Sequence, residues 1–123
     1  VPVACRDLAE VVAREHGNVH RSGEFNAAAV MRLLERCDAL RRPDRFADLL
    51  LACECDARGR LGLEESAYPQ RERLGRALRL ALAVDASEIA SQAAAQGRQG
   101  PAVGEAIQRA RADAVATGLD APV

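Results

Sequence analysis

The sequence lacks several residue types, and these absences narrow its structural class. Its 123 residues contain no tryptophan, one tyrosine and two phenylalanines, and none of its 17 basic residues is a lysine. The apolar half of the composition is therefore mostly alanine, leucine and valine, small side chains that suit close packing between helices. An all-α fold is expected, an irregular bundle of about six helices around one core.

Signals for membranes and secretion are also missing. No stretch reaches the roughly 20 apolar residues that a membrane-spanning helix needs, and no basic region precedes an apolar signal core. The four cysteines, Cys5, Cys37, Cys53 and Cys55, form no CxxC pair, and an aliphatic core needs no disulfides. We expect reduced, mostly buried thiols in a cytoplasmic protein. The helical pattern begins directly at Val1 without an initiator methionine, and we interpret this start as the edge of a fragment cut from a longer chain.

Hydrophobic periodicity predicts six helices. The expected spans are about 3–16, 27–40, 43–58, 70–84, 86–96 and 101 onward. Gly17 should end or kink the first helix, and Asn26 is the expected N-cap of the second. Pro43 suits a first helical position, and the Asp85 segment has the pattern of a capping box. Gly97 should end the fifth helix.

The segment from Gly59 to Pro69 has no periodicity and is rich in turn residues, so it is expected to be a long surface connection and a subdomain boundary. At its start, Gly59 has the position of a left-handed helix cap. Near its end, Tyr68 could stack on a nucleic-acid base or pack on the core, and the sequence does not separate these alternatives.

The two histidines, His16 and His20, are four residues apart, so a helix continuing through Gly17 would place both imidazoles on one side. Asp38, a carboxylate at the end of the second apolar run, could face the same site. A cluster of histidine and carboxylate suits a divalent metal that activates water. From spacing alone, the pattern is more often that of one helix-end histidine bonded to backbone carbonyls beside a second, solvated histidine.

The arginines supply candidates for RNA contact, because guanidinium groups bind phosphate through paired hydrogen bonds and stay charged. One candidate patch is Arg73, Arg76 and Arg79 in the fourth helix. The other is Arg98, beside the start of the last helix, where backbone N–H groups add phosphate donors. A charged helix face is more often simply solvated, and richness in arginine is also typical of GC-rich codon usage.

Several segments resemble, in order along the chain, the bacterial multifunctional CCA-adding tRNA nucleotidyltransferases. The segments REHGNVH at 14–20 and LLERCDALRRPDRF at 33–46 resemble the later part of the family's HD domain. The segments LACECDARGRLG at 51–62 and YPQ at 68–70 resemble the signature that follows it, and GPAVGEAI at 100–107 resembles the C-terminal helix. The resemblance covers nearly the whole chain.

The resemblance implies an enzyme that adds C, C and A to tRNA 3′ ends using CTP, ATP and Mg²⁺. In one branch it also implies a phosphohydrolase for 2′,3′-cyclic and 2′-phosphates, with a transition metal such as Ni²⁺. By position, His16 matches a histidine of that hydrolase site, Asp38 lies where the final aspartate ligand is often found, and His20 is a looser match. The chain lacks the His-Asp doublet and the paired carboxylates that hold Mg²⁺, so neither catalytic site is complete.

We therefore expect residues 1–60 to be the last helices of an incomplete HD domain and residues 61–123 to be a C-terminal tRNA-binding tail. The expected function is to bind and position tRNA, with no certain cofactor and no membrane partner. One alternative is an autonomous metal-dependent phosphohydrolase that uses His16, His20, Asp38 and Glu15. Another is a structural helical module that forms a homodimer and ignores RNA.

Overall fold

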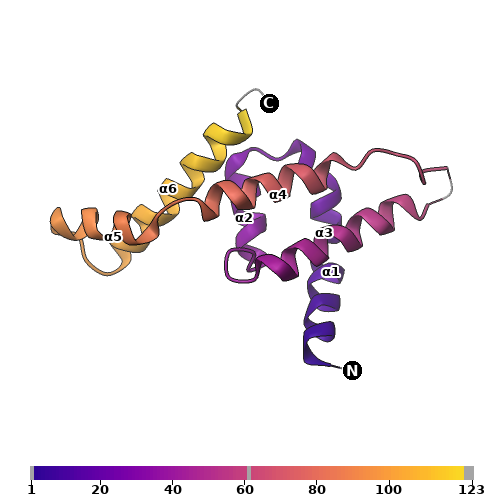
Figure 1. The fold of residues 1–123 in the computed structure, drawn as a ribbon, viewed down its shortest axis with the longest axis horizontal. Helices are drawn as coiled ribbons and strands as arrows, with labels where there is room; N and C mark the ends of the chain where they lie inside the picture. The colour runs from indigo at the N-terminus through magenta and orange to yellow at the C-terminus, as the bar shows by residue number, and fades with distance from the viewer. Residues whose placement is uncertain (1, 61, 121–123) are drawn as a thin grey trace.

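A computed structural model describes residues 2–60 and 62–120 of the chain. Its α-helices are α1 (Val3–Arg21), α2 (Ala27–Arg36), α3 (Pro43–Arg58), α4 (Pro69–Leu82), α5 (Ala86–Ala95) and α6 (Pro101–Asp120), with a 3-10 turn η1 (Ser22–Glu24) after α1. No strand occurs in the described ranges, and the all-α prediction is confirmed. Figure 1 shows α2, α3 and α4 at the centre, α1 projecting on one side and the α5–α6 hairpin on another.

The first helix is longer than predicted, because α1 continues through Gly17 to Arg21. A glycine inside a helix costs only about 1 kcal/mol relative to alanine. The turn beyond it buries Val19 completely, and the hydroxyl of Ser22 donates to the Val19 carbonyl at 2.7 Å. These contacts outweigh the glycine penalty, so the prediction that Gly17 ends or kinks the helix was wrong.

The second helix is shorter than predicted, because α2 ends at Arg36 and does not run into residues 38–40. Asp38 has φ 54°, a left-handed conformation that aspartate tolerates better than most side chains. The N–H of Ala39 donates to the Leu34 carbonyl at 2.9 Å, and the N–H of Asp38 donates to the Glu35 carbonyl at 3.0 Å. These two bonds form a Schellman motif, which ends the helix without glycine.

The starts of the central helices follow the sequence signals. The Asn26 side chain accepts a hydrogen bond from the Ala29 N–H at 2.9 Å, and proline occupies the first turn of both α3 and α4. Proline suits this position because its missing N–H has no partner there in any case. At the end of α3, however, Gly59 has φ −71°, so the predicted left-handed cap is absent and the helix ends in a right-handed turn.

The α5–α6 hairpin was predicted closely. The Asp85 carboxylate accepts a hydrogen bond from the Glu88 N–H at 3.0 Å and caps α5. Gly97 has φ 80°, and the N–H of Arg98 donates to the Ala93 carbonyl at 2.9 Å, so a second Schellman motif ends α5. Gly100, at φ 60°, turns the chain into α6.

One hydrophobic core joins α1, α2, α3, α4 and α6. Phe46 is its largest fully buried side chain, and Val115 of α6 is completely buried in the same cluster. The core therefore extends across the boundary placed at residues 60 and 61, although the division into two subdomains is not tested and stays a prediction. In the described part of the chain, no helix has both the length and the apolar character to cross a membrane.

Candidate functional site

Four side chains from three elements meet beside the C-terminal half of α1. The imidazole rings of His16 and His20 lie edge to face with their centroids 5.9 Å apart, so both point to one side of the helix. His20 Nε2 lies 2.9 Å from Asp56 Oδ2 on α3, and His20 Nδ1 lies 2.7 Å from the Tyr68 hydroxyl. His20 is therefore held from both sides, at the junction of α1, α3 and the segment before α4.

The protonation of these groups follows from their surroundings. The hydrogen bond from His20, with smaller contributions from the charges of Arg60 and His16, lowers the pKa of Asp56 below its usual value. Burial raises the pKa of Tyr68 well above its usual value, and nearby anionic groups add to the rise. Because the carboxylate only accepts and the phenol stays protonated, His20 donates from Nε2 to Asp56 and accepts a hydrogen bond from the Tyr68 hydroxyl at Nδ1 when the imidazole is neutral.

The fit of this group to a metal ion is partial. The Nδ1 of His16 lies 2.9 Å from the Val12 carbonyl, which can only accept, so in the neutral imidazole the proton is on Nδ1 and Nε2 has the lone pair. This is the arrangement that metal-binding histidines usually have. Both ring nitrogens of His20 are already hydrogen-bonded, however, and no three His, Cys, Asp or Glu side chains of the described residues could together hold a metal ion. The residues present do not make a complete metal site.

The other two acidic residues considered as ligands are engaged elsewhere. Asp38 lies in the turn after α2, where its carboxylate accepts from Arg41 Nε at 2.8 Å and pairs with Arg41 Nη2 at 2.5 Å. Glu15 is buried on α1, with 3% of its side chain exposed, and accepts from Arg36 Nε at 3.0 Å. Asn18 Nδ2 also donates to Glu15 at 3.0 Å. These contacts make Glu15 a link between α1 and α2.

Asp56 is the carboxylate that the sequence analysis did not assign to this site. A signal for it existed, because Asp56 follows the buried Cys53 by three residues and therefore shares the face of α3 that packs on α1. Of the two alternatives for Tyr68, packing on the core is the one observed, since only 9% of the residue is exposed. Whether His16, His20 and Asp38 serve as metal ligands is not tested, and that assignment stays a prediction.

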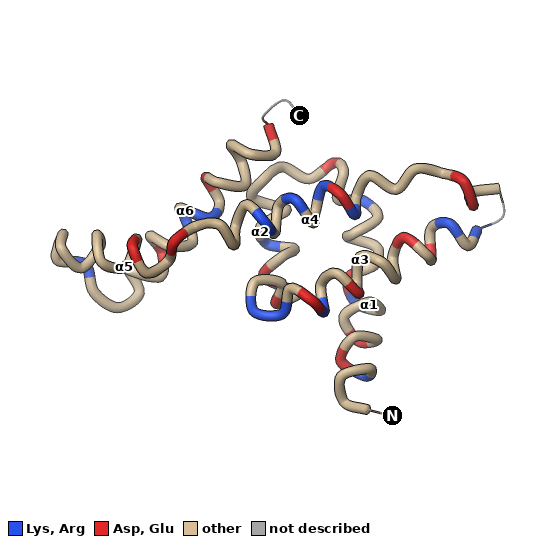
Figure 2. Tube along the Cα trace, in the orientation of Figure 1, with Lys and Arg blue, Asp and Glu red and all other residues tan. Residues whose placement is uncertain are grey.

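The four arginines proposed for RNA contact differ in their surroundings. Arg73 is occupied within the fold, because its Nη1 donates to the Ser22 carbonyl at 2.7 Å and its Nη2 to the Phe25 carbonyl at 2.8 Å. Arg79 is exposed, with only a 3.8 Å contact to Glu72. Figure 2 shows basic residues recurring along α4. The patch predicted there therefore contains one arginine whose guanidinium supports the η1 turn.

Arg98 lies at a groove between α5 and α6. Arg98 and Arg109 both line this groove, which encloses about 500 Å³, together with the acidic side chains of Glu105 and Asp113. Arg98 itself is exposed. The groove therefore offers guanidinium groups at the surface of the hairpin, in a mixed electrostatic setting.

The cysteines divide evenly between core and surface. Cys37 and Cys53 are buried, whereas Cys5 and Cys55 are exposed, and all four thiols are free. Burial raises the pKa of Cys37 and of Cys53 to about 11, so both thiols stay protonated and unreactive at neutral pH. The expectation of free thiols is confirmed, while the expectation that most are buried holds for two of the four.

Comparison with known proteins gives a consistent set of relatives. The proteins named Multifunctional CCA protein from Paracidovorax citrulli, Polaromonas naphthalenivorans and Variovorax paradoxus are 68%, 63% and 66% identical to the chain, each over 94% of its length. The chain spans only 27–28% of the length of these relatives. No family model matches the chain, and no solved structure matches it. The resemblance inferred from the sequence motifs is confirmed.

Proposed function

We propose that this chain, which corresponds to a segment of the multifunctional CCA proteins, binds tRNA and positions it for the reactions of a CCA-adding enzyme. The observation that carries the proposal is the match to these proteins along 94% of the chain at 68% identity. The reactions themselves, nucleotide addition with CTP, ATP and Mg²⁺ in the cytoplasm, would take place on parts of such an enzyme that this sequence does not contain.

The exposed arginines support binding to an RNA backbone. Arg79 and Arg98 are exposed, and the half-buried Arg76 makes no hydrogen bond or ion pair with another described residue. Contacts between such side chains and phosphates give affinity that is independent of sequence. This affinity falls steeply as the salt concentration rises, because the release of counterions from the RNA becomes less favourable. Arg73 is left out of this set, because the η1 carbonyls already occupy its guanidinium.

We also propose that His16, His20 and Asp56 form part of a phosphohydrolase site that residues outside this chain complete. The free Nε2 of His16 and the carboxylate of Asp56 are the available donors, and a divalent metal bound there would supply Lewis-acid activation of water. Asp56 is preferred to Asp38 because it contacts His20 directly, whereas Asp38 pairs with Arg41. The chain alone is expected to hydrolyse no 2′,3′-cyclic nucleotide.

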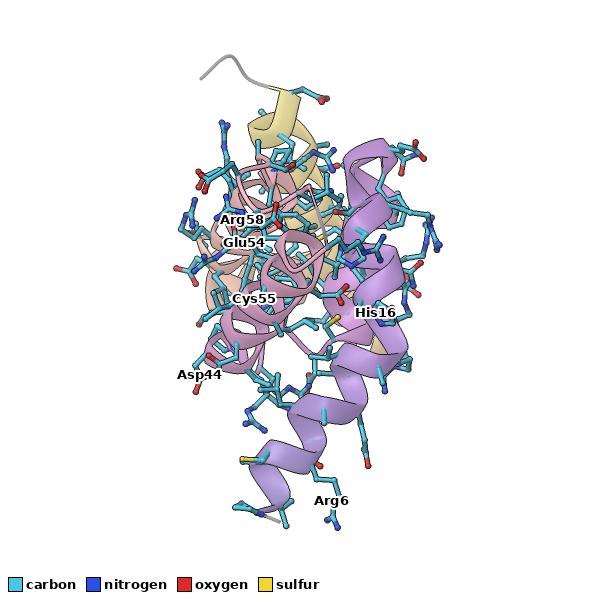
Figure 3. All side chains as sticks on the ribbon, turned by 90° about the vertical axis from the view of Figure 1, so that its right-hand side faces the viewer. Arg6, His16, Asp44, Glu54, Cys55 and Arg58 are labelled. Carbon is cyan, nitrogen blue, oxygen red and sulfur yellow. The ribbon has the colours of Figure 1, made fainter. Side chains whose placement is uncertain are left out.

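The proposal is tested by the anisotropy of labelled tRNA titrated with the chain over a range of salt concentrations. We compare wild type with Arg76→Gln/Arg79→Gln, which removes two positive charges, with Arg98→Gln, which removes one, and with Arg6→Gln as a control that removes one charge from another surface. Figure 3 shows Arg6 near the N-terminal end of α1, well away from His16. Each lost phosphate contact should lower the slope of log Kd against log salt by about one.

Two results would contradict the proposal. Absence of tRNA binding even at low salt would show that the chain does not hold tRNA by itself. An equal change of slope in the Arg6 control would show that the loss of positive charge anywhere matters, and that the arginines of α4 and of the hairpin form no binding surface.

A further inference from the structure

A groove of about 520 Å³ lies between α1 and α3, and His16 and Asp56 both line it. His20 is not among the described residues that line this groove, although Asp56 Oδ2 lies 2.9 Å from its Nε2 and the ring of His16 lies edge to face beside it. His16 and Asp56 are therefore open to a molecule in the groove, whereas His20 reaches it only through them.

Asp56, His20 and Tyr68 form a chain of hydrogen bonds that runs from the surface into the fold. The exposed fraction is 53% for the Asp56 side chain, 22% for the His20 side chain and 9% for Tyr68 as a whole residue. A carboxylate that is half exposed exchanges among the staggered rotamers of its side chain unless a fixed partner selects one. The His20 ring, which is largely buried, is such a partner.

The start of α4 holds His20 at both its ring and its backbone. The Tyr68 hydroxyl lies 2.7 Å from His20 Nδ1, and the two rings lie edge to face with their centroids 5.8 Å apart. Gln70 Nε2 donates to the His20 carbonyl at 2.9 Å. The imidazole cannot turn without breaking its contact with Tyr68, so contacts between α1 and the start of α4 set the direction in which Nε2 points towards Asp56.

These contacts leave His20 no nitrogen for a metal ion. A neutral imidazole has one N–H donor and one acceptor nitrogen, and Asp56 and Tyr68 occupy both. Asp56 differs, because its carboxylate makes no other hydrogen bond or ion pair with the described residues, so Oδ1 stays available beside the groove. The geometry therefore separates a residue that can contact a substrate, Asp56, from a residue that orients it, His20.

We propose that His20 is a positioning residue, which holds the Asp56 carboxylate in one orientation beside His16, and that it does not itself bind a metal ion. The inference rests on the proposed phosphohydrolase site, and it gives His20 a role different from the ligand that its spacing with His16 predicts. Hydrogen-bonding partners of this kind typically contribute about 10- to 100-fold to activity, because reactive groups lose most of their effect when their orientation varies.

The first experiment is ¹⁵N NMR of the histidine rings in the 123-residue chain at alkaline pH, where imidazoles are neutral. His20 should have its proton on Nε2 and His16 should have its proton on Nδ1, because the acceptors that fix them contact opposite nitrogens. His16→Gln assigns the two sets of signals. A His20 proton on Nδ1, or an even mixture of the two tautomers, would overturn the inference, and this result needs no substitution at His20 that could disturb folding.

The second experiment measures the χ1 rotamer of Asp56 by three-bond NMR couplings in wild type, His20→Gln and His20→Phe. Wild type should show one rotamer. The Gln amide can still donate from nearly the same place, so His20→Gln should keep that rotamer, whereas Phe has no donor and His20→Phe should average among rotamers. A single, unchanged Asp56 rotamer in a folded His20→Phe chain would show that His20 is only a packing residue.

Activity is measured after the chain replaces the matching segment of the Multifunctional CCA protein from Paracidovorax citrulli. With 2′,3′-cyclic AMP as substrate, His20→Phe should lower kcat about tenfold and change KM less than about twofold, whereas His20→Gln should keep most of kcat. An unchanged kcat in His20→Phe, while Asp56→Asn is inactive, would overturn the inference. A wild-type chimera without hydrolysis, or an Asp56→Asn chimera as active as wild type, would instead refute the proposed phosphohydrolase site, and the NMR results would still decide whether His20 orients Asp56.

Discussion

The buried carboxylate of Glu15 provides a direct test of how α1 and α2 are held together. Glu15→Gln keeps the size of the side chain but removes its charge and replaces one acceptor oxygen by a donor NH₂ group. In the wild type, Arg36 Nε lies 3.0 and 3.3 Å from the two carboxylate oxygens, and Asn18 Nδ2 lies 3.0 Å from one of them. In the variant, at least one of these donors would face another donor.

We expect Glu15→Gln to lower the free energy of unfolding by about 2 kcal/mol, the usual contribution of a hydrogen bond to a charged group. The loss is no larger because 43% of the Arg36 side chain is exposed, so water can solvate its charge. For a chain of this length, that loss lowers the melting temperature by about 8 °C. The measurement is urea unfolding followed by far-UV circular dichroism. Glu10→Gln, an exposed glutamate on the same helix, is the matched control.

The loss should also depend on pH. Burial by itself raises the pKa of Glu15, but the hydrogen bonds from Arg36 and Asn18, with the positive charges of Arg36 and Arg14, hold it below its usual value of 4.5. A carboxyl whose pKa is lowered on folding stabilises the protein above its unfolded pKa, and this contribution is lost as pH falls through the folded pKa. The difference between wild type and Glu15→Gln should therefore shrink below pH 4.5. A difference that is constant from neutral to acid pH, or equal to that of Glu10→Gln, would refute the reasoning.

Two further predictions concern α4 and α6. Arg73→Met should lower the free energy of unfolding by about 2 kcal/mol, because the carbonyls of Ser22 in η1 and of Phe25 just after it lose their donor. The exposed Arg79→Met should change it by less than about 0.5 kcal/mol. Gly104→Ala should stabilise α6 by about 1 kcal/mol, since its new methyl meets open space. Gly118→Ala should destabilise, because its methyl would collide with the Leu80 side chain. Urea unfolding checks all four variants, and equal effects within either pair would contradict these assignments.

The sequence predicts most of the fold because its helix signals are local. The Asn26 and Asp85 caps, the proline that begins α3 and the positive φ of Gly97 each act within a few residues, and all appear where they were expected. The errors arise where distant contacts decide. Gly17 stays helical because Val19 beyond it is buried by other helices, and α2 ends early because Asp38 takes a conformation usually reserved for glycine.

The candidate site is less predictable for the same reason. The i, i+4 spacing correctly placed His16 and His20 side by side once the helix continued. Spacing placed Asp56 on the same face of α3 as the buried Cys53, but it could not show that this face meets His20, because Asp38 and Asp56 each follow an apolar helical run. Only the packing of α3 against α1 brings Asp56 to His20, and only the Schellman turn takes Asp38 towards Arg41 instead.

The chain between α3 and α4 was expected to be a simple connection, but its last residue, Tyr68, and the start of α4 are tied to α1. Tyr68 contacts the His20 ring and Gln70 donates to the His20 carbonyl, so the position of His20 depends on residues about fifty places later in the chain. Arg73 extends this dependence to the η1 turn. Because these contacts cross the predicted boundary at residue 60, anything that draws α4 away from α1, including RNA held by Arg76 and Arg79, would also alter the setting of the His20–Asp56 pair. If the chain binds tRNA as proposed, that binding and the geometry of the proposed phosphohydrolase site would therefore be coupled through His20.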